Sequence, residues 1–129
     1  MKKLIAKLQQ KSAVIITDKH ESWDVAITRS PNLLFEVVIP HAVLEWFVTA
    51  KNTASGKEIW SDWVDYYHTS RDKSDDLQSQ MRDDIERFIE HLLTSELRIV
   101  ESRKFFAERQ KIEWNPNGRW EKLSLGIIK

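Results

Sequence analysis

The 129-residue chain contains no cysteine. This absence excludes disulfide bonds, cysteine-ligated zinc and iron–sulfur sites, and a thiol nucleophile, because each of these needs a cysteine sulfur. A chain without cysteine is also compatible with a reducing compartment, so the expected location is the cytoplasm.

Glycine and proline are scarce, with three of each in the chain. Loops that bind nucleotide phosphates use several closely spaced glycines, and the nucleophile elbow of many hydrolases is also glycine-rich, but the two closest glycines here are Gly118 and Gly126. The four histidines lie at least 21 positions apart, which does not match the spacing of a local metal site. The sequence therefore predicts no enzyme, no metal site and no cofactor.

Neither a charge of one sign nor a long apolar run dominates the chain. Twenty basic residues balance twenty acidic residues, so the net charge indicates no particular class of partner. No apolar run approaches the roughly 18 residues that cross a membrane, and polar residues interrupt the first ten positions, so neither a membrane span nor a signal peptide is expected. The length and the 41% hydrophobic content predict a single folded domain over residues 1–129.

The first half of the chain is rich in β-branched and aromatic residues separated by short polar segments. Such a pattern predicts short antiparallel strands, because loops of a few residues join neighbouring strands in opposite directions. The expected strands cover residues 13–17, 23–28, 33–39 and 44–51. Residues 58–67 fit both a helix and a strand, and the aromatic content favours a strand.

One long amphipathic helix is predicted over residues 75–93. Apolar residues recur there at intervals of three and four positions, which places them on one face: Leu77, Met81, Ile85, Phe88, Ile89 and Leu92. The adjacent pairs Asp75–Asp76 and Asp83–Asp84 are interpreted as part of the solvated face. A second short helix near residues 4–8 and a frayed terminus are equally compatible with the first ten residues.

The C-terminal third is expected to return to strands. Residues 97–100 and 104–106 have strand character, with an extension of the preceding helix as the alternative. Residues 110–114 and 119–123 flank Asn115-Pro116-Asn117-Gly118, which is typical of a hairpin turn. The predicted fold is therefore α+β, an antiparallel sheet of about six to eight strands packed against one long helix.

Charge is distributed unevenly along the chain. Residues 61–101 contain five bases and eleven acids, a net −6, whereas residues 102–129 contain seven bases and three acids, a net +4. The helical pattern places Asp76, Asp83 and Glu90 opposite the apolar stripe. We interpret these acids as a candidate surface that attracts a basic protein.

Aromatic residues lie within the same acidic block. Trp60 and Trp63 have Asp62 and Asp65 as close neighbours in sequence. Tryptophan side chains often supply much of the binding energy of a protein interface, although most of the six tryptophans are expected to pack in the core. These four residues complete the candidate partner-binding set.

Residues 44–51 and 56–67, in a small cysteine-free chain rich in tryptophan and with an acidic block, resemble immunity proteins of bacterial polymorphic toxins, including those of contact-dependent growth inhibition systems. The resemblance implies stoichiometric binding to a cognate toxin domain, which blocks the active site or the substrate-binding surface of the toxin. Many such toxins are nucleases with basic clefts. The balanced total charge departs from strongly acidic nuclease inhibitors.

The alternative function is nucleic-acid binding by the basic C-terminal hairpin. Single-stranded nucleic acids bind grooves that combine cationic side chains with aromatic stacking groups. The candidate residues are Arg103, Lys104, Phe105, Phe106, Arg109, Lys111, Trp114, Arg119, Trp120 and Lys122.

Overall fold

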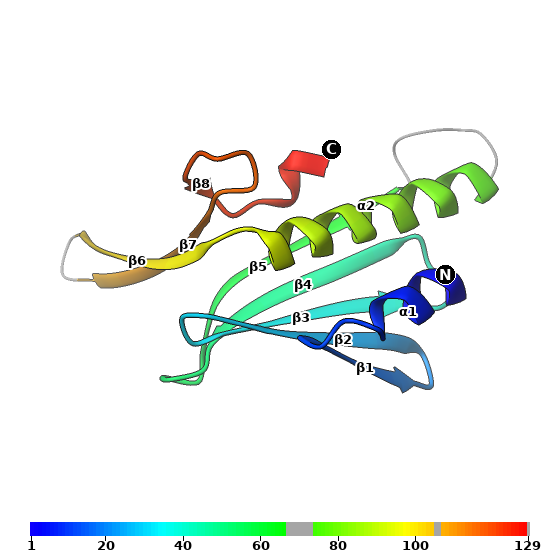
Figure 1. Ribbon diagram of the computed structural model, residues 1–129, viewed down its shortest axis with the longest axis horizontal. Coiled ribbons are helices and arrows are strands. Elements are labelled where there is room, and N and C mark those ends of the chain that lie inside the picture. The colour runs from blue at the N-terminus through cyan, green and yellow to red at the C-terminus, as the bar shows by residue number, and fades with distance from the viewer. Residues whose placement is uncertain (67–73, 105–106, 129) are drawn as a thin grey trace.

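A computed structural model describes residues 1–66, 74–104 and 107–128. These residues form two antiparallel sheets, two α-helices and a short 3₁₀ helix (Figure 1). The first sheet has five strands in sequential order, β1 (Val14–Lys19), β2 (Ser22–Arg29), β3 (Leu33–Pro40), β4 (Glu45–Asn52) and β5 (Lys57–Asp65). The second sheet has the order β6 (Leu97–Lys104), β7 (Ala107–Trp114) and β8 (Glu121–Lys122).

Tight turns set the meander of the first sheet. Asn32 adopts a positive φ of 55° between β2 and β3, and Gly56 adopts a φ of 74° before β5. Asparagine and glycine adopt this backbone region at lower cost than other residues, so the local sequence fixes where the chain reverses. A β-bulge at Ala50/Lys51 shifts the register between β4 and β5.

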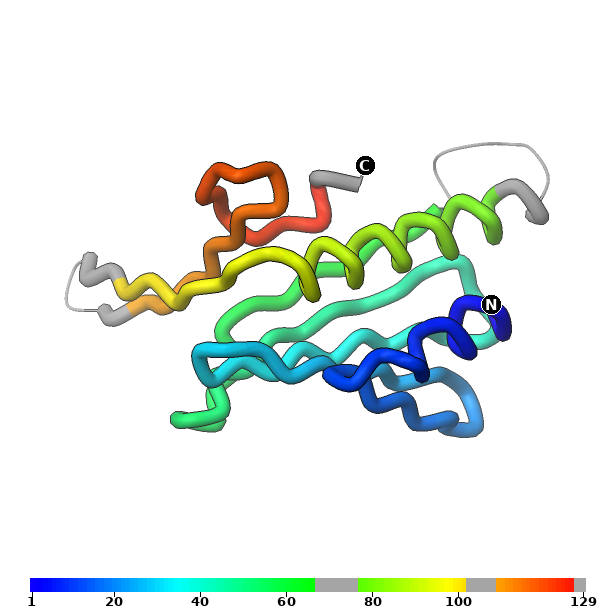
Figure 2. The backbone as a smooth tube through the Cα atoms, viewed as in Figure 1, coloured from blue at the N-terminus to red at the C-terminus, as the bar shows by residue number. Residues whose placement is uncertain are grey.

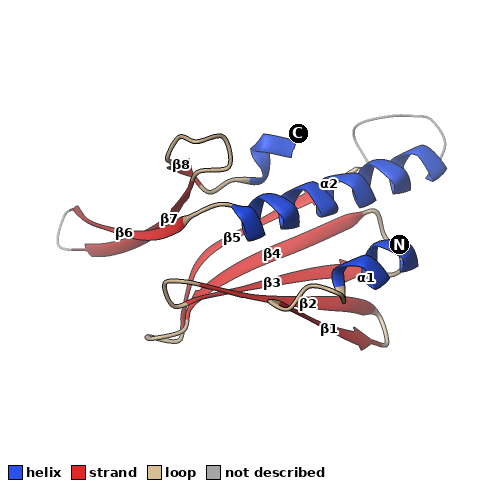
Figure 3. Ribbon diagram, in the orientation of Figure 1, coloured by secondary structure: helices blue, strands red, loops and turns tan. Residues whose placement is uncertain are grey.

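Both α-helices lie on the same face of the five-stranded sheet (Figure 3). Helix α1 (Lys2–Leu8) buries Leu4, Ile5 and Leu8. Helix α2 (Ser74–Thr94) buries the predicted apolar stripe except Leu77, which is half-buried against the core. The strands alternate accordingly, with a strict buried and half-buried pattern along β3. The core therefore lies between the inner face of this sheet and the two helices.

The second sheet extends the core beyond the end of α2. Ile112 and Trp114 of β7 and Leu97 of β6 are buried in the same apolar cluster as α2. The Trp114 ring lies 5.8 Å from the Phe88 ring. The 3₁₀ helix η1 (Leu125–Ile128) follows β8 and contacts both α2 and β5.

The α+β class and the antiparallel strands are confirmed, but the architecture differs from the prediction in three respects. The strands are divided between two sheets instead of forming one, and α1 accompanies the long helix. The expected strand at residues 119–123 is only the two-residue β8. Residues 58–67 and 97–104 were open to a helical interpretation, and β5 and β6 resolve both as strands within the described residues.

Asp84 corrects the interpretation of the acidic pairs on α2. Asp83 is exposed, whereas Asp84 is buried and accepts a hydrogen bond from the Tyr66 hydroxyl at 2.9 Å. Asp84 lies three positions after Met81 and four before Phe88, so the helical spacing predicts that it lies on the same face as the apolar stripe. The polarity of the aspartate side chain suggested that Asp84 is exposed to solvent. The hydrogen bond from Tyr66, 18 positions away, satisfies the buried carboxylate and makes its burial possible.

Within the described residues, no helix is both long and apolar enough to span a membrane.

Candidate functional site

The four candidate residues of β5 lie on two different faces of the five-stranded sheet. Directly paired residues of antiparallel strands share a face. Trp60 pairs with Ala50 and Asp62 pairs with Val48, and both partners are buried on the inner face. Trp63 pairs with Phe47 and Asp65 pairs with Glu45, which places them on the outer face. The four residues therefore do not form one surface.

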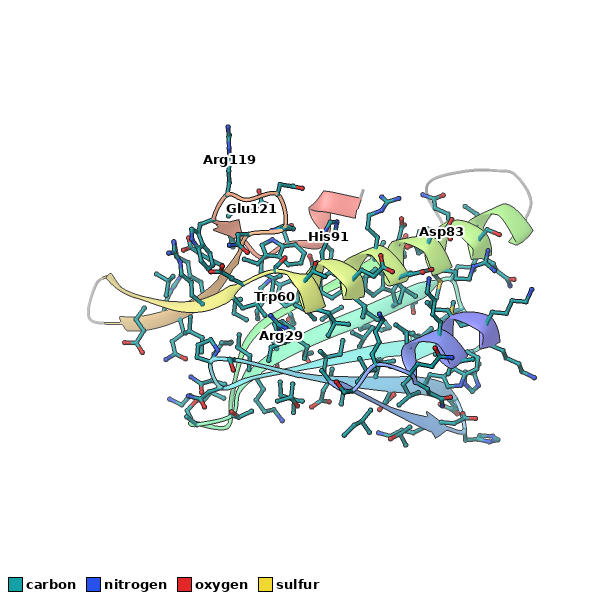
Figure 4. The ribbon with its side chains drawn as sticks, viewed as in Figure 1. Arg29, Trp60, Asp83, His91, Arg119 and Glu121 are labelled. Atoms are coloured by element: carbon teal, nitrogen blue, oxygen red, sulfur yellow. The ribbon has the colours of Figure 1, made fainter. Side chains whose placement is uncertain are left out.

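Trp60 and Asp62 contact the interior of the protein. Trp60 is half-buried against the apolar core, and Figure 4 labels it near the C-terminal end of α2. One carboxylate oxygen of Asp62 accepts a hydrogen bond from the Leu125 amide at 3.4 Å, and the other accepts one from the Trp63 amide at 2.8 Å. Asp62 therefore links η1 to β5.

The outer face of the five-stranded sheet exposes an aromatic pair. The Phe47 and Trp63 rings lie 6.4 Å apart at an interplanar angle of 24°, and the two residues are 36% and 51% exposed. Val38 pairs with Phe47 from the other side, so an apolar row crosses β3, β4 and β5. Helices α1 and α2 lie on the opposite face, so neither helix covers this row.

Phe47 and Val38 were absent from the sequence-based candidates. Phe47 is a large aromatic residue at an outward position of the alternating segment 44–51, and this alternation was the signal that could have identified it. Its proximity to Trp63 depends on the β4–β5 register, which the bulge at Ala50/Lys51 determines. Sequence spacing alone did not predict the pair.

The candidate acids of α2 lie on the opposite side of the molecule. Asp83 and Glu90 are exposed, and Asp76 belongs to α2 but its side chain is not among those described. Lys7 of α1 forms an ion pair with the neighbouring Glu86. The hydrogen bond that Lys7 donates to Glu86, together with the charges of Glu86 and Glu90, raises the pKa of the Lys7 ammonium group. A base that is distant in sequence therefore lies beside the acidic helix face, where Figure 2 shows α1 running alongside α2.

The C-terminal hairpin presents fewer stacking groups than the sequence suggested. Trp114 is buried in the core, and Trp120 is partly covered by the Arg98 guanidinium, which lies 4.0 Å from the centre of its ring. Phe105 and Phe106 lie outside the described residues. The basic side chain of Arg119 points away from the body of the protein (Figure 4).

A half-open cleft of about 310 Å³ lies between α1, α2 and the loop that follows β3. The Trp23 and His41 rings, 4.2 Å apart, form one wall, and Met1, Leu44 and Arg82 contribute to the rest. His41 Nε2 lies 3.6 Å from the Asp18 carboxylate. Among the described residues, no group of three or more histidine, aspartate or glutamate side chains is arranged to hold a metal ion.

Comparisons with protein-family models, curated proteins and solved structures find no match. Function is therefore inferred from surface chemistry. An exposed aromatic pair on an open sheet face can anchor another macromolecule by apolar packing, and the neighbouring carboxylates can select its charge.

Proposed function

We propose that the protein is a protein-binding module of the immunity type, which binds and neutralises a cognate toxin domain. The observation that supports this proposal most strongly is the exposed Phe47–Trp63 pair on the uncovered sheet face. Large aromatic side chains that remain exposed in the free protein are typical anchors of interfaces, because they exclude much apolar area from water on binding.

The protein acts by binding to the toxin domain and catalyses no reaction of its own. Binding one copy to one toxin domain covers the toxin's active site or substrate-binding surface. Carboxylates around the interface accelerate encounter with a basic toxin, and buried aromatic contacts slow dissociation. Tight binding in the cytoplasm, the proposed site of action, then prevents damage to the producing cell.

The direct test uses the small C-terminal domain of a large secreted protein encoded beside this gene, if such a domain is present. We expect expression of that domain alone to stop growth and co-expression with this protein to restore it. The two proteins should also co-purify as a one-to-one complex. Equal killing with and without this protein, together with no co-purification, would contradict the proposed function.

A further inference from the structure

The described charges on the exposed side of α2 largely cancel. Among the described side chains, Asp83, Glu86 and Glu90 face Arg82, Arg87 and Lys7, three acids against three bases. Lys7 pairs with Glu86, and Arg82 lies 3.9 Å from Asp83. The part of α2 whose side chains the structure describes therefore attracts a basic partner less strongly than the sequence pattern indicates.

The outer face of the five-stranded sheet has a different balance. The strand registers place seven charged residues on this face: Lys19, Asp24, Glu36, Glu45, Lys51, Glu58 and Asp65. Among the described strand residues, five acids against two bases give this face a net charge of −3, in a chain whose total charge is zero. Both bases already pair within the face, Lys19 with Asp24 at 2.7 Å and Lys51 with Glu36 at 3.9 Å.

The acids and the apolar row belong to one surface. Glu45 and Asp65 form the cross-strand pair next to Phe47 and Trp63 on the same face, and Asp24 pairs with Val38 at the other end of the row. Carboxylates beside the apolar row favour the approach of a cation to this surface. The guanidinium group of an arginine also binds favourably over an aromatic ring.

We propose that the outer face of the five-stranded sheet is the docking surface, and that its occupant is a cationic protein surface whose arginine or lysine side chains lie over Phe47 and Trp63. The inference rests on the proposed function and specifies its binding surface. A second copy of this chain is a poorer occupant, because a symmetric contact would oppose two faces that each carry −3.

A first experiment locates the surface without any toxin. A deca-arginine peptide is titrated into the isotopically labelled protein at low salt, and amide and indole NMR shifts are followed, with deca-glutamate as the control peptide. We expect the largest shifts at Val38, Phe47 and Trp63, and their loss at high salt. Shifts concentrated on α2 or on the β6–β7 hairpin would overturn the proposal.

A second experiment compares matched variants in binding to the domain encoded beside the gene. Glu45→Lys on the sheet and Glu90→Lys on α2 make the same charge change at different surfaces. Trp63→Ala is matched by Trp120→Ala, which makes the same substitution at a residue that is 39% exposed and lies outside the five-stranded sheet. We expect Glu45→Lys to lower the association rate about tenfold and Trp63→Ala to raise Kd about thirtyfold, with both controls near wild type. An unchanged melting temperature shows that each variant folds.

The outcomes separate the two proposals. Neutralisation that persists in Glu45→Lys and Trp63→Ala but fails in Glu90→Lys overturns the docking surface and leaves the proposed function standing. If the neighbouring domain neither binds nor is neutralised, the proposed function fails, and the peptide titration still decides whether this face selects cationic proteins. Self-association through Trp63, measured by light scattering, would indicate a second copy as the occupant and overturn the proposal.

Discussion

At the residue scale, the most unusual group is the buried carboxyl of Asp84. The Trp46 indole donates to the Tyr66 oxygen at 3.0 Å, and the Tyr66 hydroxyl donates to Asp84 at 2.9 Å. Burial raises the pKa of Asp84 above its ordinary 3.8, because the charged form is less stable away from water. Burial also raises the pKa of the Tyr66 phenol. These two hydrogen bonds thus join β4, the residue that follows β5 and the middle of α2.

The raised pKa of Asp84 predicts a pH-dependent stability. Between about pH 3.8 and the higher folded-state pKa, the folded protein binds more protons than the unfolded chain, so this residue's contribution falls as the pH rises through that window. We expect Asp84→Asn to remove this component, so that the variant gains stability relative to wild type with rising pH and the difference then levels off. Urea unfolding at a series of pH values measures the difference. A constant difference would contradict the prediction, and Glu90→Gln serves as an exposed control.

Arg29 of β2 caps the C-terminal end of α2. Its two terminal nitrogens donate to the carbonyls of Leu93 and Ser95 at 2.9 and 2.6 Å. A cation at this position satisfies carbonyls that the helix cannot pair and interacts favourably with the helix dipole. We expect Arg29→Met to lower the free energy of unfolding by about 1.5 to 3 kcal/mol, as for hydrogen bonds to a charged group, and Arg29→Lys to lower it less. Denaturant unfolding tests both, and a loss below about 0.5 kcal/mol in Arg29→Met would show that the contacts are dispensable.

At the scale of elements, α2 supplies the largest share of side chains to the core. Ile85 and Phe88 are fully buried, and the Phe88 ring lies 5.7 Å from Trp46 and 5.8 Å from Trp114. We expect Ile85→Ala to cost about 2 to 5 kcal/mol and Phe88→Ala about 3 to 5 kcal/mol of stability, because each leaves a cavity where α2 packs. Ile15→Ala, at an exposed position, should change stability by less than about 0.5 kcal/mol. Similar losses in all three variants would mean that burial does not determine the cost.

At the scale of the whole molecule, one apolar core connects the two sheets. Ile112 and Trp114 of the second sheet belong to the same buried cluster as Val37 and Trp46 of the first. We therefore expect a single cooperative unfolding transition, in which far-ultraviolet circular dichroism and tryptophan fluorescence change together. Two separated transitions would show that the second sheet unfolds independently and would contradict a single domain over residues 1–129.

Features that depend on neighbours along the chain were predictable from the sequence. Periodicity of three and four residues identified α2 and its buried face, and alternation with short turns identified the antiparallel strands. Strands were also preferred over a helix for residues 58–67 and 97–100 because of their β-branched and aromatic content, and β5 and β6 confirm this preference within the described residues. These signals are local because backbone geometry repeats over a few residues.

Features that depend on residues distant in sequence required the three-dimensional structure. The division into two sheets depends on which strands pair, and the Phe47–Trp63 contact depends on their register. Lys7 forms an ion pair with Glu86 of α2, which lies 79 positions away in the sequence. Tyr66 donates a hydrogen bond to Asp84, 18 positions away, and so makes the burial of this carboxyl possible. A sequence lists charges in one dimension, but electrostatic energy and desolvation depend on distances in three dimensions, so the charge that each surface presents follows from the fold.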